Sequence, residues 1–591
     1  MINLILILSL AKQMDNPNGK KRRQNVASEC NVGIIKHRNE GNLRIDGDLK
    51  ENAFDFIVYE IDLNKQVVEM RKDMKLPILE KAEIVDESSW FDKLREHDIL
   101  TQYYSKEELV KLENELQTLL ENKDGEIPLI LIKDKDHRKS IHALFKSCKK
   151  LFTKSKDNLI VVLYGKENSG FGRPMVNWKA LGGQYLEFCL LKCNIDTIQA
   201  VNEIARRSHL QPKLFSYAGT KDKRACTSQL IRCHRVEYKR LCNVPFDFPG
   251  DGIKKIKLCN FKHVDSPLRL GDCFGNRFIV VLRNVALSSG NFSESELSEA
   301  VNDSLTELKN NGFINYFGMQ RFGNSSVGTH DLGKLVILKE WYKLVQLLLE
   351  PRVGEIERIA EARQVYKDTN DCKLALNLFP YSCLAEKSVL GHLVKNPLDY
   401  KGAFNAIPRN LRTMYAHAYQ SYIWNLMTTK RIEIHGYAVQ TGDMVMLNDR
   451  ELERNERGVK EMKPIIVNEE NIKEYSIYDV VLPCPGSDTI FPPNLKSEYM
   501  ELFKSEELTA EDFGEDPQLN LSGTYRHIIS KAIDLKWDIF KYDDAKPLHA
   551  VFEEEMDNSS NGDKYAVKVQ VSLKTSSYVT VMLRELLNTV E

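Results

Sequence analysis

One short peptide combines residue types that could act on a substrate. In Tyr217–Gln229, YAGTKDKRACTSQ, Asp222 lies between two lysines in a turn rich in Gly and Thr. Neighbouring cations keep a carboxylate ionised, and an ionised carboxylate can act as a nucleophile or a base. The order of Gly, Thr and Lys differs from GxxxxGK[ST], which excludes a Walker phosphate loop. On the residues alone, a charged surface turn remains the competing interpretation.

A second peptide, NYFGMQRFG at 315–323, has a composition suited to holding a planar ring. Aromatic side chains such as Phe317 offer a stacking surface, Asn315 and Gln320 can hydrogen-bond a ring edge, and Arg321 can hold a phosphate. The alternative is an aromatic-rich strand followed by a turn.

Two further peptides carry weaker signals. In Lys50–Glu60, KENAFDFIVYE, strand alternation places Phe56 and Glu60 on one face, although a core phenylalanine beside an exposed glutamate is the simpler interpretation. In YAHAYQSYIWN, at 415–425, three tyrosines at helical spacing indicate packing. Gln420 and Asn425 of that helix either contact RNA or cap neighbouring elements.

The elements that position these peptides mix strands and helices without a regular βαβ alternation. Apolar patterns predict strands in NLIVVLYG, GGQYLEFCLLK and NRFIVVLRNV, and helices over 196–208 and 294–310. Residues 331–430 are mostly helical in pattern, and a Pro-rich turn cluster follows at 482–493. This indicates an α+β fold with a mixed, largely antiparallel sheet, in which a helical block interrupts a split domain.

A basic segment interrupts the first part of this pattern. Residues 133–157 hold nine Lys or Arg against three Asp, after a predicted helix at 107–120 and a short strand at 127–132. We interpret 91–157 as a small inserted α/β unit with a basic helix. Its lysines are expected to contact phosphates without sequence preference, or else to form only a solvated face.

Length and composition bound the class of protein. The 591 residues suggest three or four domains. The 42% apolar and 28% charged residues are typical of globular protein, and 83 Lys and Arg nearly balance 84 Asp and Glu. Twelve cysteines without a CxxC pair favour reduced thiols in an intracellular protein.

The N-terminus supports several expectations. The apolar run at 2–11 is too short to span a bilayer and lacks the basic start of a signal peptide, so we expect neither a membrane span nor secretion. Translation starting at Met14 is a hypothesis that detection of peptides from residues 1–12 would refute. The run KKRR at 20–23 is either a nuclear import signal or a solvated basic run.

Taken together, these peptides resemble the TruD-type pseudouridine synthases, in particular their longer eukaryotic branch, the multisubstrate pseudouridylate synthases. The resemblance rests on AGTKDKRACTSQ, NYFGMQRFG and YQSYIWN. KENAFDFIVYE, GNRFIVVLR, DVVLPCPG, SGTYRHII and SSYVTVMLREL support it in the same order along the chain. The sequence departs from the family at Leu573-Lys574-Thr575, where a Leu-Pro is usual, and at Val579, which stands for an alanine.

The resemblance implies a split catalytic domain, an inserted TruD-specific α+β domain and the basic insertion. The expected division is a disordered segment 1–45, catalytic parts 46–90, 158–330 and 523–591, the basic insertion 91–157, and the inserted domain 331–522.

The resemblance also implies site residues. Asp222 matches the family's catalytic aspartate, and Lys50, Phe56, Asn315 and Phe317 fall where the family places active-site residues. We expect Lys50 to pair with Asp222, Phe317 to stack on uracil, Asn315 to orient Asp222 or the base, and Phe56 to close the pocket. Supporting positions are Glu60, Lys221, Gln320 and Arg321.

In the basic insertion, Arg138 and His142 resemble an Arg-x-x-x-His module that binds single-stranded nucleic acid. With Lys146, Lys149 and Lys150 they form the expected RNA-binding set.

The implied reaction moves uracil from an N1 to a C5 link with ribose and needs neither a cofactor nor a metal. The implied substrate is tRNA, typically uridine 13, with messenger and small nuclear RNA as further substrates. We expect a monomer in the nucleus, the cytoplasm or both. The alternatives are a catalytically silent RNA-binding or tRNA-chaperone protein, and an RNA glycosidase that uses Glu60 as a second carboxylate.

Overall fold

The computed structural model describes residues 28–69, 87–156, 159–165, 181–242, 255–446, 464–514, 521–542 and 562–588, apart from 42, 147, 149, 289, 291 and 324, together with 176, 178, 179 and 519. The apolar start, Met14 and the KKRR run lie outside the described residues. Among the described residues, no helix is both long and apolar enough to cross a membrane.

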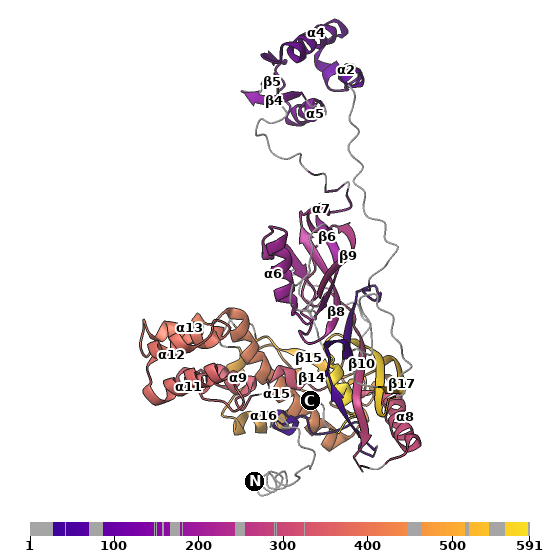
Figure 1. The fold of residues 1–591 in the computed structure, drawn as a ribbon, viewed down its shortest axis with the longest axis vertical. Coiled ribbons are helices and arrows are strands. Elements are labelled where there is room, and N and C mark those ends of the chain that lie inside the picture. The colour runs from indigo at the N-terminus through magenta and orange to yellow at the C-terminus, as the bar shows by residue number, and fades with distance from the viewer. Residues whose placement is uncertain are drawn as a thin grey trace.

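A large sheet forms the centre of the molecule (Figure 1). Its strands run in the order β17 (Ile533–Tyr542), β18 (Lys564–Lys574), β10 (Gly275–Leu287), β2 (Phe56–Ile61), β8 (Cys226–His234), β6 (Tyr185–Cys193) and β9 (Lys255–Val264). In addition, β1 (Ile45–Leu49) pairs with β10, and β7 (Phe215–Tyr217) pairs with β8. The sheet is mixed and mostly antiparallel, as the sequence predicts.

The pairing of β2 with β8 is parallel, with Ile57 opposite Cys226, whereas the other pairings between described strands of this sheet are antiparallel. Residues that precede two parallel neighbouring strands meet at one edge of a sheet. This pairing therefore brings the peptide before Phe56 to the peptide before Cys226, although they lie far apart in the sequence.

The strand β2 is more buried than its alternating pattern suggests. The sequence predicts a half-buried strand, but Phe56, Ile57, Val58, Glu60 and Ile61 are all buried. The reason is its central position, because one face packs into the main core and the other contacts a small apolar cluster with Cys193 and Cys226. A central strand covered on both faces loses the alternation of an exposed one.

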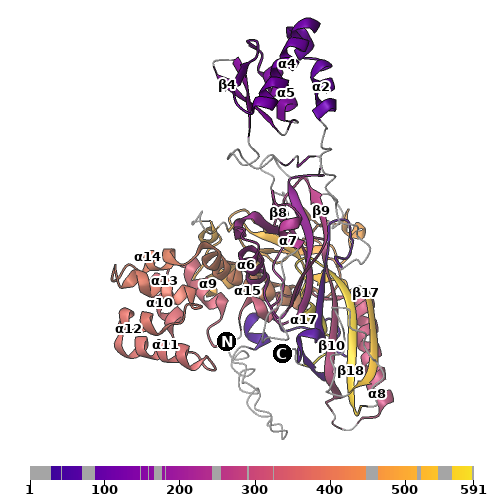
Figure 2. The same cartoon turned by 45° about the horizontal axis from the view of Figure 1, so that its top comes forward.

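Helices cover the sheet and form a block beside it (Figures 1 and 2). Near the sheet lie α6 (Thr197–Arg207), α7 (Lys239–Cys242) and α8 (Glu294–Asn311). The helical block comprises α9 (Thr329–Ile337), α10 (Trp341–Leu349), α11 (Glu357–Thr369), α12 (Cys372–Leu378), α13 (Leu384–Leu393), α14 (Tyr400–Ala406) and α15 (Arg409–His435). The mostly helical pattern predicted for 331–430 is thus confirmed.

The remaining elements are short. A second sheet has the order β13 (Ile465–Ile466), β12 (Met444–Val445), β14 (Val480–Cys484) and β15 (Thr524–His527), and β11 (Phe313–Ile314) pairs with β16 (Ile529–Ser530). Two further helices are α16 (Lys496–Ser505) and α17 (Val579–Leu583). The turn cluster predicted to start at Leu482 is wrong at its beginning, because Pro483 lies within β14 opposite Tyr525.

The expected disorder through residue 45 is wrong for the described residues from Ser28 onward. A short 3-10 helix, Glu29–Val32, is followed by Ile34, and Val32 and Ile34 are almost completely buried. Asn425 of α15 donates a hydrogen bond to the Val32 carbonyl. The burial of Val32 and Ile34 anchors this segment on the long helix, and the ion pair of Glu29 with Arg584 adds to the anchoring.

The basic insertion is a separate unit, and Figures 1 and 2 both show it standing away from the sheet. It contains α2 (Glu87–Arg95), α3 (Leu100–Tyr103), α4 (Lys106–Asn122), β3 (Glu126–Pro128), α5 (Lys135–Lys146), β4 (Leu151–Lys156) and β5 (Leu159–Tyr164). Its buried apolar residues form a core of their own, with members from Trp90 to Val162. Strand β5 lies beyond the expected range 91–157 but pairs with β3 and β4.

Candidate active site

The meeting of the two peptides at the sheet edge produces an ion pair. Lys50 Nζ lies 2.7 Å from Asp222 Oδ2, across 172 positions of sequence. A second contact joins the same loops, because Arg224 donates to the Glu51 carbonyl at 3.0 Å. The side chains of Lys50 and Asp222 are 18% and 39% exposed, so the pair faces solvent from the floor of an open site.

The backbone before β2 is arranged to present Lys50. Its φ is +57°, in the left-handed region, which costs a non-glycine residue about 1 kcal/mol or more. Asn52 and Asp55 then form a reciprocal capping box around a short 3-10 turn. The buried Asp55 also makes a two-pronged ion pair with Arg283 of β10, at 2.7 and 2.9 Å. These contacts fix the turn that carries the strained lysine.

A pocket of about 150 Å³ surrounds Asp222. One wall is aromatic, because Lys50 Nζ lies 3.9 Å above the ring of Phe56, and Phe56 meets Phe278 edge to face. The lining comes from β2, β10, the Asp222 loop and the segments around Gln320 and Tyr578: Phe56, Val58, Thr220, Lys221, Asp222, Asn276, Phe278, Gln320, Ser577, Tyr578, Val579 and Thr580.

Glu60 is not the exposed residue that the simpler interpretation expects. It is 1% exposed, and its carboxylate pairs with Lys221 Nζ at 3.1 Å and accepts from the Leu230 backbone N–H at 3.0 Å. Lys221 also donates to Asn276 Oδ1 at 2.5 Å. Glu60 and Asn276 are register partners on β2 and β10, so the sheet itself builds this contact. Glu60 thus neutralises Lys221 beneath the pocket.

Two buried polar side chains hold the start of the Asp222 loop. Thr197 Oγ1 accepts from the Lys221 backbone N–H at 2.9 Å and donates to Gln229 Oε1 at 2.7 Å. Gln229 in turn donates to the Gly219 carbonyl at 2.9 Å. Because buried hydrogen bonds are costly to leave unmade, this network fixes the loop in one conformation.

The peptide 315–323 contributes less directly than the sequence predicts. Gln320 lines the pocket, with Nε2 3.5 Å from Asp222 Oδ2. Asn315 is 5% exposed, and its side chain donates to the His527 carbonyl and accepts from Arg526. Of the described residues that line the pocket, Asn315 is not one. Its observed partners are structural, whereas the sequence predicts contact with Asp222 or the base.

Phe317 also lies outside the described pocket lining. The guanidinium of Arg526 lies 4.1 Å from its ring centroid, and Trp424 meets it edge to face at 5.5 Å. Asn425 accepts from the Phe317 N–H and donates to its carbonyl. The ring of Tyr578, which does line the pocket, lies 6.5 Å from that of Phe317. Phe317 therefore supports the pocket wall from behind Tyr578.

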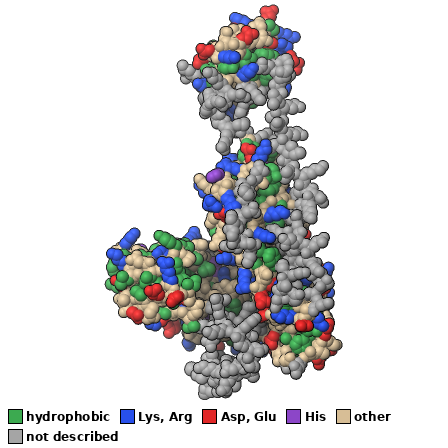
Figure 3. Space-filling view, in the orientation of Figure 1, with side chains coloured by type: hydrophobic (Ala, Val, Ile, Leu, Met, Phe, Trp, Pro, Cys, Tyr) green, Lys and Arg blue, Asp and Glu red, His purple; other side chains and the backbone are tan. Residues whose placement is uncertain are grey.

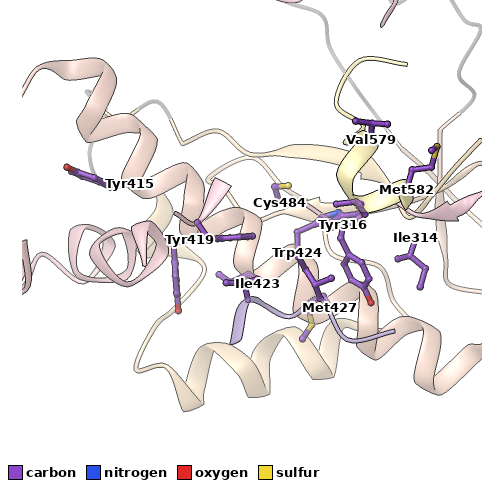
Figure 4. Close-up of a cluster of buried hydrophobic side chains, with 14 of the residues drawn as sticks. Ile314, Tyr316, Tyr415, Tyr419, Ile423, Trp424, Met427, Cys484, Val579 and Met582 are labelled. Atoms are coloured by element: carbon purple, nitrogen blue, oxygen red, sulfur yellow. The ribbon is translucent and has the colours of Figure 1, made fainter. Parts of the chain in front are cut away.

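Helix α15 provides the frame for this segment (Figure 4). Its tyrosines at 415 and 419 are buried, in agreement with packing, and Trp424 donates to the Leu482 carbonyl. Gln420 is 3% exposed and donates to the Pro485 carbonyl. Of the two open interpretations of Gln420 and Asn425, the structure shows the one in which they cap neighbouring elements.

Two other positions in the peptide have packing roles. Arg321 Nε donates to Ser421 Oγ at 3.3 Å and points toward α15 rather than the described pocket. A side chain at Gly318 would come within 3.2 Å of Cδ1 of Tyr578. The glycine thus lets the chain approach the tyrosine that lines the pocket.

In the basic insertion, the Arg-x-x-x-His pair makes internal contacts. Arg138 Nη1 donates to the carbonyls of Ile132 and Lys133 at 2.6 and 2.7 Å. His142 bonds Thr153 and Ser155 of β4 through its two ring nitrogens, at 2.6 and 2.8 Å. Burial, followed by the charge of Arg138, lowers the pKa of His142, which keeps it neutral at physiological pH.

Of the three lysines in the expected RNA-binding set, the structure describes the side chain of one. Lys150 is exposed, Lys149 lies outside the described residues, and the side chain of Lys146, at the end of α5, is also outside them. On the face shown in Figure 3, this unit carries both basic and acidic side chains.

The sequence analysis does not identify several of the residues that line the pocket. Asn276 and Phe278 lie in GNRFIVVLR, and Tyr578 and Thr580 lie in SSYVTVMLREL. These strings support the resemblance, but nothing in their composition marks single residues as functional. The alternation of β10 could have found Asn276, because it shares a face with the aromatic Phe278.

Metal ligands do not gather in the described part of the chain, where no group of three or more His, Cys, Asp or Glu side chains could hold an ion. The pocket offers the solvent-facing carboxylate of Asp222, the ammonium groups of Lys50 and Lys221, and an aromatic wall.

Comparison with known proteins places this site in a family. Residues 166–586 match the family model described as tRNA pseudouridine synthase D (TruD). The chain belongs to the TruD family of pseudouridine synthases. It is therefore an isomerase that forms pseudouridine. The matched range contains Asp222, Asn315 and Phe317, whereas Lys50 and Phe56 lie before it.

Curated relatives extend the similarity over nearly the whole chain. A human protein named pseudouridylate synthase 7 homolog is 34% identical over 581 residues, which cover 95% of this chain and 81% of the relative. A Schizosaccharomyces pombe protein named multisubstrate pseudouridine synthase 7 is 31% identical, covering 98% of this chain and 93% of the relative. The TruD-type identification made from the motifs is thus confirmed.

The fold is also similar to a solved structure. The crystal structure of the putative tRNA pseudouridine synthase D from Methanosarcina mazei superposes with a TM-score of 0.57 at 22% sequence identity, covering 95% of this chain and 97% of that chain. At this identity the likeness establishes the fold alone and does not assign functions to single residues of the site.

Proposed function

We propose that Asp222 is the catalytic carboxylate of this pseudouridine synthase and that its substrate is a uridine of tRNA, extruded from its stack into the pocket of Phe56, Phe278 and Tyr578. The observation that carries this proposal is the 2.7 Å pair of Asp222 with Lys50 at the floor of an aromatic pocket. Messenger and small nuclear RNA are proposed as further substrates, and uridine 13 as the tRNA position.

The reaction needs one carboxylate at the ribose. Isomerisation breaks the bond between N1 of uracil and C1′, turns the freed ring and joins its C5 to C1′. Asp222 either adds to C1′ or removes the 2′ proton, and its pairing with Lys50 keeps the carboxylate ionised for either step. Placing uridine against Asp222 requires flipping the nucleotide out of the RNA.

Substrate binding strengthens the ion pair that it covers. In the open pocket, water screens the attraction between Lys50 and Asp222, and a solvent-facing pair contributes little. A uracil that fills the pocket displaces this water and lowers the effective dielectric constant. The same aromatic wall can retain the detached uracil, since base stacking contributes roughly 1–3 kcal/mol.

The geometry changes the roles proposed for the NYFGMQRFG peptide. Gln320, 3.5 Å from Asp222, is the polar group of this peptide placed to orient the carboxylate or the base. Tyr578 takes the stacking role that the sequence gives to Phe317, while Phe317, Asn315 and Arg526 form the support behind it. Phe56 lines the pocket and carries Lys50 above its ring.

The position of Glu60 favours isomerisation over base removal. Hydrolytic glycosidases use two carboxylates, one of which activates water. The second candidate here, Glu60, is buried and engaged by Lys221 and the Leu230 N–H. Among the described lining residues, Asp222 is the one carboxylate at the pocket.

We propose the following domain roles. The catalytic domain is built from three segments that share the large sheet, represented by β2, by β6 to β10, and by β17 and β18. The helical block and second sheet form the inserted domain, which reads RNA shape together with the basic insertion. The protein acts as a monomer in the nucleus, the cytoplasm or both.

The deciding experiment uses tRNA transcript labelled with tritium at C5 of uridine. Isomerisation replaces that hydrogen, so turnover releases tritium to water. Wild-type protein is expected to release tritium, and Asp222→Ala to release none while still binding tRNA. The matched control is Asp538→Asn, an exposed β17 carboxylate far from the pocket residues in sequence, which should leave the rate within about twofold. Full turnover by Asp222→Ala would refute the assignment.

A further inference from the structure

A completely buried ammonium group lies beneath the catalytic loop. Lys192, on β6, is 0% exposed. Its Nζ donates hydrogen bonds to three main-chain carbonyls, those of Ile195 at 2.8 Å, Asp222 at 2.8 Å and Lys221 at 3.2 Å. An ammonium group has three protons, so each one has a carbonyl partner.

We propose that Lys192 is a positioning residue for pseudouridine formation, holding the backbone of Asp222 at the place where its carboxylate meets Lys50 and the ribose. The inference rests on the proposed role of Asp222 and extends it. Lys192 acts through the loop backbone, because its described contacts are with carbonyl oxygens and not with the pocket.

Burial of this charge has a cost that packing alone does not explain. Removing an ammonium group from water is unfavourable by several kcal/mol unless good hydrogen bonds replace the water. A leucine or methionine on β6 would avoid that cost and fill the same space. The ammonium group of a lysine instead donates to three carbonyls from two segments, and this shared donor ties the loop to the end of β6.

The positive charge also acts at the pocket. The ionisable groups that face Lys192 are Asp222 and Lys221 from the loop, Cys193 at the end of β6, and Asp196 from the turn between β6 and α6. Burial lowers the pKa of Lys192 to about 8, although Asp222 and Asp196 oppose this change. Above that pH the loop loses one donated proton and a nearby positive charge.

Lys192 complements the network of Thr197 and Gln229. Those side chains hold Gly219 and the N–H of Lys221, which are the entry to the loop. Lys192 holds the next two carbonyls, at Lys221 and Asp222. The catalytic residue thus has its main chain fixed from below and its side chain fixed by Lys50 from the other strand.

The test compares Lys192→Met, Lys192→Arg, Asp222→Ala and the wild type in single-turnover tritium release at saturating tRNA. The control is Lys387→Met, because Lys387 also donates to two main-chain carbonyls, at Leu376 and Phe379, but lies in the helical block. Lys192→Met should lower the rate about 100-fold, the effect expected of a misplacement of about 1 Å. Its tRNA dissociation constant should stay within about twofold, and Lys192→Arg should recover part of the rate.

The pH profile separates positioning from general stability. The wild-type rate should fall as the pH rises above about 8, because Lys192 then loses its proton. The residual rate of Lys192→Met should not fall between pH 7.5 and 9. An unchanged rate for Lys192→Met, the same alkaline fall in that variant, or a loss matched by Lys387→Met would each overturn the proposal. An active Asp222→Ala would instead refute the catalytic assignment, which makes the two failures distinguishable.

Discussion

The edge of the large sheet and the basic insertion place the same residue type, lysine, in different surroundings. At the sheet edge, Lys50, Lys192 and Lys221 each have specific partners at 2.5–3.2 Å, and two of them are buried. In the insertion, lysines such as Lys133, Lys135 and Lys139 are exposed on or before a surface helix. Isomerisation needs fixed atoms, whereas attraction of phosphates needs only charge near the RNA. Under the roles proposed above, it is the surroundings of a lysine, and not the residue type, that distinguish one acting at the site from one contacting RNA.

Apart from the loss of Asp222 itself, the largest expected effect is at Lys50. Lys50→Met removes the partner of Asp222 and should lower the single-turnover rate by about 100–1000-fold, because it removes a preorganised charge from the reacting centre. Lys50→Arg should retain more activity, since it keeps the positive charge. Tritium release at saturating tRNA measures both. If Lys50→Met changed only tRNA affinity, Lys50 would resemble the lysines of the insertion, and the contrast between the two regions would fail.

A second prediction concerns the separate core of the insertion. Trp90 is 1% exposed and donates to the Leu144 carbonyl. Trp90→Ala should destabilise this unit by about 3–5 kcal/mol, the usual cost of removing a buried tryptophan. Calorimetry should show an early transition for the insertion and an unchanged transition for the rest.

The matched variant for that experiment is Phe188→Ala, because Phe188 is a completely buried core residue of β6. It should lower the other transition and abolish turnover, whereas Trp90→Ala should keep the rate at saturating tRNA within about threefold. One shared transition that moves in both variants would show that the two regions unfold together.

A moderate effect on tRNA affinity is expected from the three lysines of the expected RNA-binding set. Changing Lys146, Lys149 and Lys150 to Glu should weaken tRNA binding and lower the slope of log affinity against log salt by about 2, because each phosphate contact contributes roughly 0.7–0.9. The rate at saturating tRNA should not change. The control carries the same three changes at Lys309, Lys536 and Lys541, which are exposed on α8 and β17. If both triple variants weakened tRNA binding equally, the lysines of the insertion would contribute only through the overall charge of the protein.

The smallest effect is expected at His142. Burial and the charge of Arg138 lower its pKa, which disfavours the protonated form, so we expect protonation of His142 to add little positive charge to the insertion. His142→Gln should change the tRNA dissociation constant by less than about twofold at pH 7.5 and at pH 6.5. Binding that tightens in the wild type between pH 7.5 and 6.5, but not in His142→Gln, would show that His142 contacts RNA as a cation.

The sequence predicts the fold better than it predicts the contacts of single side chains. Apolar periodicity locates β6, β10, α6 and α8 because each repeats a pattern over nine or more residues. It fails at Ile34 and Pro483, where one or two residues pack against distant elements.

At the site, Asp222 could be named because its peptide is unusual, and Lys50 because of the resemblance. The positions of Tyr578 and Lys192 could not. Tyr578 lies in an ordinary apolar helix start, and Lys192 ends an apolar strand where a lysine has no local meaning. Their roles depend on which carbonyls and rings the folded sheet brings beside them.

The parallel pairing of β2 with β8 also has a consequence for the timing of synthesis. Lys50 leaves the ribosome long before Asp222, and Tyr578 follows long after Asp222. Parallel strands of such large sequence separation pair slowly, because loop closure precedes the contacts that reward it. We therefore expect no turnover from a nascent chain in which β10 has not yet paired with β2 and β18. Because the pocket lining comes from β2, β10 and the segment after β18, the pocket forms only when these strands have assembled, and an incomplete chain is not expected to begin a reaction that it cannot finish.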